Sequence, residues 1–296
     1  MDQAQVKLPD RVDGRNVLVL PRDTDPVALA TAWFPEASWE RSPVTAPTAP
    51  RAMTGARFRG MVDAPVPAVP GLLALLPGAT LEGPTALDSD DAREAGLGAR
   101  DVDLYALDST DPAGLALVYG WMSAAARRTA GGIVPADRSR LVTPDPGAAV
   151  DLTLWSPLAL TARDALPLVR PAMTGARVGH PVESRDGALS ITATFEYDGA
   201  VTVRLARSRE IPVALSALDS GAYGPWAYVV TWEPPNPAEL RTETPSQLHL
   251  IARSRVQQSV ARIAAAVWRG AGGTVLDSGG FVVTPDELRE MATAAR

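Results

Sequence analysis

Ala-Met-Thr-Gly-Ala-Arg, at residues 52–57, occurs a second time without a change at residues 172–177. A proline precedes each occurrence by one or two residues. Six identical residues in a row are not expected by chance in a chain of 296 residues, and internal repeats of this kind indicate a duplicated structural unit. The repeated stretch therefore suggests that the chain contains the same unit twice.

A second match supports the duplication, because it follows the first in the same order. Val-Thr-Pro-Asp occurs at residues 142–145 and at residues 283–286, each time ten residues after a Gly-Gly pair. We therefore predict two diverged copies, at residues 1–147 and 148–296.

The pattern around each Gly-Gly pair predicts how a copy ends. Glycine readily adopts the left-handed conformation that closes a helix, so Gly131-Gly132 and Gly272-Gly273 should each end an Ala-rich helix. A short hairpin should follow each pair. In the second copy, Thr284 and Pro285 are typical of the first residues of a helix, which we expect to run to Ala295.

The second copy shows the clearer secondary-structure signals. Asp198-Gly199 is typical of a tight hairpin turn between two strand-like runs. The expected elements are a strand at 150–154, a helix at 161–169, the hairpin strands at 188–197 and 200–205, a strand at 226–232 and a helix at 247–268.

The first copy resembles the second in outline. We expect a buried strand at 17–20, a helix at 25–34, a strand at 101–107 and a helix at 111–130. Residues 35–84 are rich in proline and show little periodicity, so we predict mostly loop there, with a short helix at Gly71–Leu76. The middle hairpin of this copy is therefore expected to be degraded.

Together these signals predict an α+β fold. Each copy follows the order β-α-β-β-β-α-β-β, which favours antiparallel sheets with helices packed on one face. No long linker separates the copies, so we expect a pseudo-two-fold arrangement within one rigid body.

Composition excludes several functional classes. The chain has no cysteine and a single lysine, Lys7, so thiolate chemistry, P-loop nucleotide sites and Schiff-base enzymes are not expected. A net charge of −6 argues against nucleic-acid and anionic-membrane partners. Neither a signal peptide nor a membrane-spanning run is seen, and we expect a cytoplasmic protein.

Acidic residues and histidines give weak catalytic signals. The acidic run between Asp88 and Asp103 could bind a cation, but Leu-Asp-Ser recurs through the chain and is ordinary turn and capping chemistry. The two histidines, His180 and His249, have no neighbouring motif of a catalytic triad. We assign no catalytic residue, no metal site and no cofactor.

The repeated turn is the best candidate ligand site. Thr54, Gly55 and Arg57, and likewise Thr174, Gly175 and Arg177, could form an anion pocket from backbone N–H groups and a guanidinium. The alternative is structural: Gly175 would close the helix that begins at Thr161, and Arg177 would neutralise its negative end.

A second set of candidates could contact a partner. Arg204 and Arg207 follow a predicted strand, and Tyr223 and Trp226 flank a Gly-Pro pair in an aromatic loop. Aromatic residues and arginine are enriched at interfaces, although a solvated sheet face and a core tryptophan explain the same residues.

Three functions remain open. The first is a non-catalytic binding or scaffold protein, chaperone-like or immunity-type, that holds a protein partner on the duplicated sheet or in a groove between the copies. The second is an enzyme that uses carboxylates, arginines and a divalent cation. The third is a structural subunit of a larger assembly, which could include further copies of the same chain.

Overall fold

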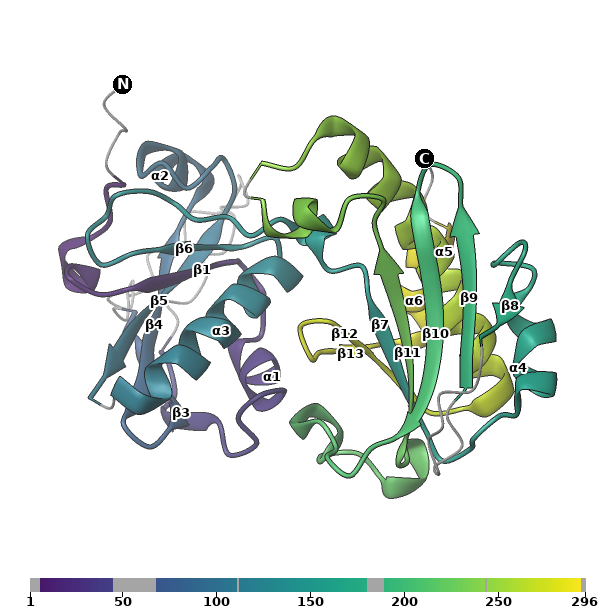
Figure 1. Cartoon of the computed structure of the whole chain (residues 1–296). Helices are drawn as coiled ribbons and strands as arrows, with labels where there is room; N and C mark the ends of the chain where they lie inside the picture. The colour runs from purple at the N-terminus through teal and green to yellow at the C-terminus, as the bar shows by residue number, and fades with distance from the viewer. Residues whose placement is uncertain (1–5, 45–67, 111, 180–188, 243, 294–296) are drawn as a thin grey trace, which may run out of the picture. The chain divides into compact units, whose positions relative to one another are not determined.

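The structure is a computed structural model, and it describes residues 6–44, 68–110, 112–179, 189–242 and 244–293 (Figure 1). Contacts divide the chain into two compact units. The first unit contains Met1–Ala30 and Glu36–Pro144, and the second contains Thr31–Pro35 and Asp145–Arg296. The predicted boundary of the copies at residue 147 stays a prediction.

The first unit is a six-stranded antiparallel sheet in the order β2-β3-β4-β5-β1-β6. Its strands are β1 (Val17–Pro21), β2 (Ser38–Arg41), β3 (Gly71–Leu76), β4 (Ala79–Leu87), β5 (Val102–Ser109) and β6 (Gly132–Val134). Its helices are α1 (Pro26–Thr31), α2 (Ser89–Glu94) and α3 (Pro112–Arg128), and a 3₁₀ turn, η1, covers Asp10–Val12.

Strand β1 lies inside this sheet and is buried on both faces, as its continuous apolar run predicts. On one face, Val17 and Val19 pack in a cluster with Val12 of η1 and Ala92 of α2. Helix α3 contacts β1, β4 and β6, and its Trp121 is fully buried.

The second unit is a seven-stranded antiparallel sheet in the order β13-β12-β7-β11-β10-β9-β8. Its strands are β7 (Leu152–Ser156), β8 (Arg177–Val178), β9 (Leu189–Phe195), β10 (Gly199–Arg207), β11 (Trp226–Glu233), β12 (Thr274–Asp277) and β13 (Val282–Val283). Its helices are α4 (Ala162–Val169), α5 (Gln247–Ala271) and α6 (Pro285–Thr293), with 3₁₀ turns η2 (Pro146–Ala148), η3 (Val213–Leu215), η4 (Ser220–Ala222) and η5 (Pro237–Arg241).

One face of this sheet carries the main core. Figure 1 shows α5 and α6 (yellow-green to yellow) behind strands β9–β11. Helix α5 packs on β7, β10 and β11 through a stripe that includes Val256, Val260, Ile263 and Val267. The turns η3 and η4 cover part of the opposite face, where Leu215 packs with Trp155 and Ala227.

The two units share one topology, which supports the predicted duplication. If β1 is matched with β7, β2 with β8, β3 with β9, β4 with β10, β5 with β11 and β6 with β12, the strand orders are the same. The predicted α+β class with antiparallel sheets is therefore confirmed. The two-fold relation between the copies stays a prediction.

The prediction for residues 71–76 was wrong, and the middle hairpin of the first copy is present. Gly71–Leu76 forms strand β3, which pairs with β4 across a turn at Gly78, whose φ is 81°. Leu73 and Leu75 are buried while Leu72 and Leu76 are half-buried, which is the period of two expected for a strand. Leucine and alanine favour helices, but pairing with the neighbouring strands outweighs this local preference.

The predicted alignment of the two Gly-Gly pairs was also wrong by one residue. Helix α5 ends at Gly272, whose φ is 64°, but the left-handed residue after α3 is Ala130, with φ of 52°. Gly131 is required for another reason, because a Cβ there would lie 2.3 Å from the carbonyl oxygen of Val19 in β1. A Cβ at Gly273 would lie 2.1 Å from the carbonyl oxygen of Trp155 in β7. Gly131 and Gly273 are therefore equivalent positions in the two copies.

Substitution of one buried isoleucine measures how strongly the α5 stripe holds the second unit. Ile263 is fully buried, whereas Ile251, on the same helix, is 47% exposed. Ile263→Ala should lower the free energy of unfolding by about 2–5 kcal/mol, because it leaves a cavity. Ile251→Ala should change it by less than about 1 kcal/mol. Urea unfolding of both variants checks this, and equal losses would contradict the assigned packing.

Ala130 has a left-handed backbone conformation, so its substitution by glycine should stabilise the protein instead of destabilising it. Ala130→Gly should raise the free energy of unfolding by about 0.5–1 kcal/mol, because glycine adopts positive φ without the clash of a Cβ. Ala116, which is exposed inside α3, is the control, since Ala116→Gly should lower it by about 1 kcal/mol. Thermal unfolding of the two variants should shift in opposite directions.

Candidate binding surface

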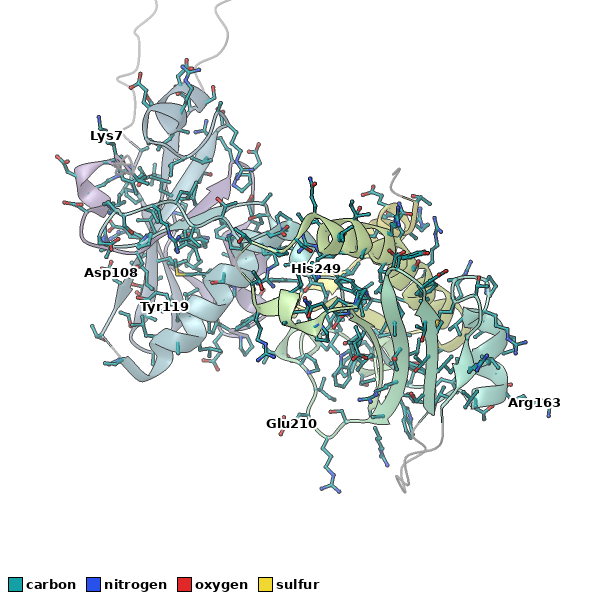
Figure 2. All side chains as sticks on the ribbon, turned by 45° about the horizontal axis from the view of Figure 1, so that its top comes forward. Lys7, Asp108, Tyr119, Arg163, Glu210 and His249 are labelled. Carbon is teal, nitrogen blue, oxygen red and sulfur yellow. The ribbon has the colours of Figure 1, made fainter. Side chains whose placement is uncertain are left out.

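The second unit contains a pocket of about 310 Å³ where three elements meet. These are the tip of the β9–β10 hairpin, the turn η5 and the first turns of α5. Figure 2 labels His249, at the start of α5. We call this site the His249 pocket; it is lined by Tyr197, Asp198, Glu239, Leu248, His249 and Ile251, among others.

Local sequence explains why these elements converge. Ser246 caps α5 by accepting a hydrogen bond from the backbone N–H of His249 at 3.3 Å. The backbone N–H of Ser246 in turn donates to Glu239 Oε2 at 2.7 Å, which ties η5 to the helix. The indole N–H of Trp232 donates to the carbonyl of Asp198 at 2.7 Å, and this bond fixes the hairpin tip.

His249 forms the floor of the pocket. Its side chain is only 6% exposed, and its ring lies 5.1 Å from that of Trp232, tilted by 46°. Buried polar groups in proteins are nearly always hydrogen-bonded. No residue in the described part of the chain makes a hydrogen bond with a ring nitrogen of His249.

The charged groups of the pocket already have partners. Arg255 lies 3.6 Å from a carboxylate oxygen of Asp198. The pKa of Glu239 lies below its ordinary value, mainly because the carboxylate accepts the hydrogen bond from the backbone N–H of Ser246. Both carboxylates of the pocket are therefore already engaged.

The rim of the pocket is apolar and unusually exposed. Leu248 is 80% exposed, Tyr197 75% and Ile251 47%. Leu248 and Ile251 are three residues apart, so they lie on one face of α5 at its start. We call Tyr197, Leu248 and Ile251 the α5 patch.

The helical phase of α5 explains both the buried histidine and the exposed leucine. His249, Ala252 and Val256 share the buried face, whereas Leu248, Ile251 and Arg255 point elsewhere. Leu248 and Ile251 are apolar like Val256, but the structure separates them from its buried stripe. A closer reading of the 3.6-residue period could have found this difference.

The repeated turn is only partly within the described residues. Thr54, Gly55 and Arg57 lie outside them. In the second copy, α4 ends at Val169, two residues before Pro171, so the expectation that Gly175 closes this helix was wrong. Gly175 lies in a later turn with φ of 79°, after Thr174, and a helix end does not adjoin it.

The structure places Arg177 and Arg204 on one face of the sheet. Arg177 of β8 is opposite Thr192, which is opposite Thr202 in β10, and Arg204 is two residues further along β10. Side chains at opposite positions, and at every second position of a strand, share a face. Both arginines are exposed.

The other partner candidates point elsewhere. Arg207 lies over the ring of Trp226 at 6.0 Å, and Trp226 packs against the main core. Tyr223 packs with Trp155 and Leu215 on the opposite face. The four partner candidates therefore do not form one surface.

The acidic run of the first unit has a structural role at its start. Asp88 caps α2 by accepting hydrogen bonds from the backbone N–H groups of Asp90 and Asp91, and Asp219 caps η4 in the same way. Burial raises the pKa of Asp103, which lies 3.7 Å from Arg22. Within the described residues, no three histidine or acidic side chains gather closely enough to hold a metal ion.

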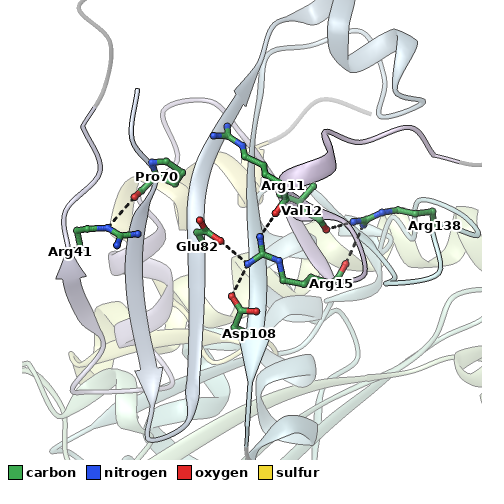
Figure 3. A network of polar contacts seen from close by, with 8 residues as sticks. All are labelled: Arg11, Val12, Arg15, Arg41, Pro70, Glu82, Asp108 and Arg138. Atoms are coloured by element: carbon green, nitrogen blue, oxygen red, sulfur yellow. Dashed lines mark hydrogen bonds and ion pairs between the residues drawn. The ribbon is translucent and has the colours of Figure 1, made fainter. Parts of the chain in front are cut away.

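A polar network of the first unit surrounds Arg15 (Figure 3). Its guanidinium bonds Glu82 and Asp108, each at 2.7 Å, and the carbonyl of Arg11. Arg138 donates to the carbonyls of Val12 and Arg15. These bonds join η1 to strands β4 and β5 and to Arg138 in the turn after β6, so we interpret the network as structural.

Loss of the Arg15 network should therefore affect stability. Arg15→Met should lower the free energy of unfolding by about 1–3 kcal/mol, because Glu82 and Asp108 lose a charged partner. Arg93 makes a single exposed ion pair with Asp90, so Arg93→Met should cost less than about 1 kcal/mol. Chemical unfolding compares the two, and an equal effect would contradict the structural role.

Within the described residues, no helix has both the length and the hydrophobicity needed to cross a bilayer. Comparison with protein-family models, with curated proteins and with solved structures finds no match.

Proposed function

We propose that this chain is a non-catalytic protein-binding protein that holds its partner on the α5 patch and the His249 pocket. The observation that carries the proposal is the exposure of Leu248, at 80%, beside Tyr197 and Ile251. Large apolar side chains that gather around a pocket on a surface are typical of interaction sites.

The composition of the surface agrees with this role. Interfaces combine an apolar centre containing aromatic residues with a polar rim. Here the apolar residues surround the pocket, and the ion pair of Asp198 with Arg255 lies at its edge. The proposal differs from the sequence analysis in its location, because it moves binding from the duplicated sheet to the start of one helix.

The elements around the patch favour binding with little rearrangement. The helix cap, the bond from Ser246 to Glu239 and the bond from Trp232 to Asp198 hold three elements in place. A surface that is already ordered loses less conformational entropy when it binds.

Substitution within the patch tests the proposal. Leu248→Ser should reduce the amount of partner retained from a native lysate at least tenfold, because a central apolar contact typically contributes more than 1.4 kcal/mol to binding. The control is Leu117→Ser, since Leu117 is 50% exposed on α3. Quantitative mass spectrometry of proteins retained by the wild type and both variants gives the measurement.

The comparison between variants decides the outcome. A protein that the wild type and Leu117→Ser retain in equal amounts, and that Leu248→Ser loses, supports the proposal. Equal retention by all three chains, or retention of nothing by the wild type, would contradict it. A second copy of this chain as the only partner would favour a structural subunit, and light scattering would show it.

A further inference from the structure

We infer that the His249 pocket receives a tyrosine side chain of the partner, whose hydroxyl group bonds the imidazole of His249. The inference rests on the proposed function for the source of the tyrosine. The pocket's own residues supply the argument for its chemistry.

His249 is a buried polar group whose ring nitrogens have no hydrogen-bond partner among the described residues. The residue is 6% exposed, and its backbone N–H donates to Ser246. Glu239, which lines the same pocket, interacts electrostatically with His249. Within the described part of the chain, the fully buried side-chain atoms without a partner are Arg22 Nε and Arg127 Nε. The ring nitrogens of His249 are not among them, so they are not fully buried, and His249 is one of the residues that line the pocket.

The imidazole is also held in a fixed position. Trp232 packs against its ring, and Ser246 fixes the first turn of α5 that carries it. A polar group that is already placed and desolvated discriminates strongly between ligands with and without a matching hydrogen-bonding group.

The rest of the pocket selects an apolar body. Leu248, Ile251 and Ala252 of α5 line it, together with Pro235. Asp198 and Glu239, the two acidic groups, are engaged with Arg255 and the backbone of Ser246, and they disfavour an incoming carboxylate. The matching ligand therefore has an apolar body and one neutral hydrogen-bonding group at its tip.

A phenol ring meets both requirements. Its flat face suits apolar walls, and its O–H can donate to a neutral imidazole nitrogen. A pocket of about 310 Å³ is at the small end of ligand sites, which suits a single large side chain. Because Leu248 and Tyr197 at the rim are 80% and 75% exposed, they offer apolar surface to a partner larger than the pocket. We therefore assign the ring to a protein, where tyrosine is a frequent binding anchor.

Two small probes test this chemistry on the full chain without the partner. p-Cresol has the tyrosine ring and hydroxyl, and toluene has the same ring without the hydroxyl. The chain contains only two histidines, so ring-labelled histidine gives one signal for His249 and one, from His180, as an internal reference. We expect p-cresol to shift the His249 signal saturably at millimolar concentration, and toluene to bind at least tenfold more weakly.

A variant isolates the contribution of the imidazole. His249→Phe keeps a ring of similar size and removes the hydrogen-bonding atoms, so it should bind the two probes with equal affinity. Probe binding to this variant is followed by tryptophan fluorescence. If the variant does not fold, His249→Gln replaces it, and the preference for p-cresol should fall without binding being lost.

Several results would overturn the inference: equal binding of the two probes to the wild type, a p-cresol shift of the His180 signal alone, no binding, or a preference that survives in His249→Phe. These failures differ from failure of the proposed function. If Leu248→Ser loses the partner but the wild type shows no preference for p-cresol, the proposed binding surface is supported and the tyrosine anchor is contradicted.

Discussion

The fold of each unit depends on where its first strand is placed. Strand β1 pairs with β5 and with β6, and β7 pairs with β11 and β12. In each unit, the first strand therefore lies between two strands that come late in the sequence of that unit. The sheet is therefore complete only when these late strands have paired with the first strand. The continuous apolar run of β1 fits this position, because β1 is buried on both faces and η1 and α2 pack on its Val17 and Val19.

The same constraint fixes the long helix of each unit. Helices α3 and α5 each lie directly before the strand that pairs with the opening strand, so they have to pack across the sheet before the chain returns. In the second unit, the buried face of α5 begins with His249 and Ala252. Its first turns carry no buried leucine and instead present Leu248 and Ile251, which makes the start of the helix available for contact.

Much of this architecture could be predicted from residues with strong local preferences. Asp198-Gly199 identified the second hairpin, Thr284 and Pro285 the start of α6, and the apolar run at residues 17–20 the opening strand. The conformation of Gly71–Leu76 was predicted wrongly because its leucines and alanine favour a helix. Pairing with β2 and β4 makes this segment a strand, and that pairing cannot be seen in the local sequence. The His249 pocket was not found because it joins elements from residues 197 to 255, and no short pattern contains it.

The glycine that follows each long helix has a consequence for recognising this unit elsewhere. A carbonyl oxygen of the opening strand occupies the space that a Cβ would need at Gly131 and at Gly273. The distance between helix and sheet is therefore set by contact between main chains, and side chains on either side can change without altering it. A glycine ten or eleven residues before Val-Thr-Pro-Asp is therefore a practical fingerprint of this unit for a search among other sequences.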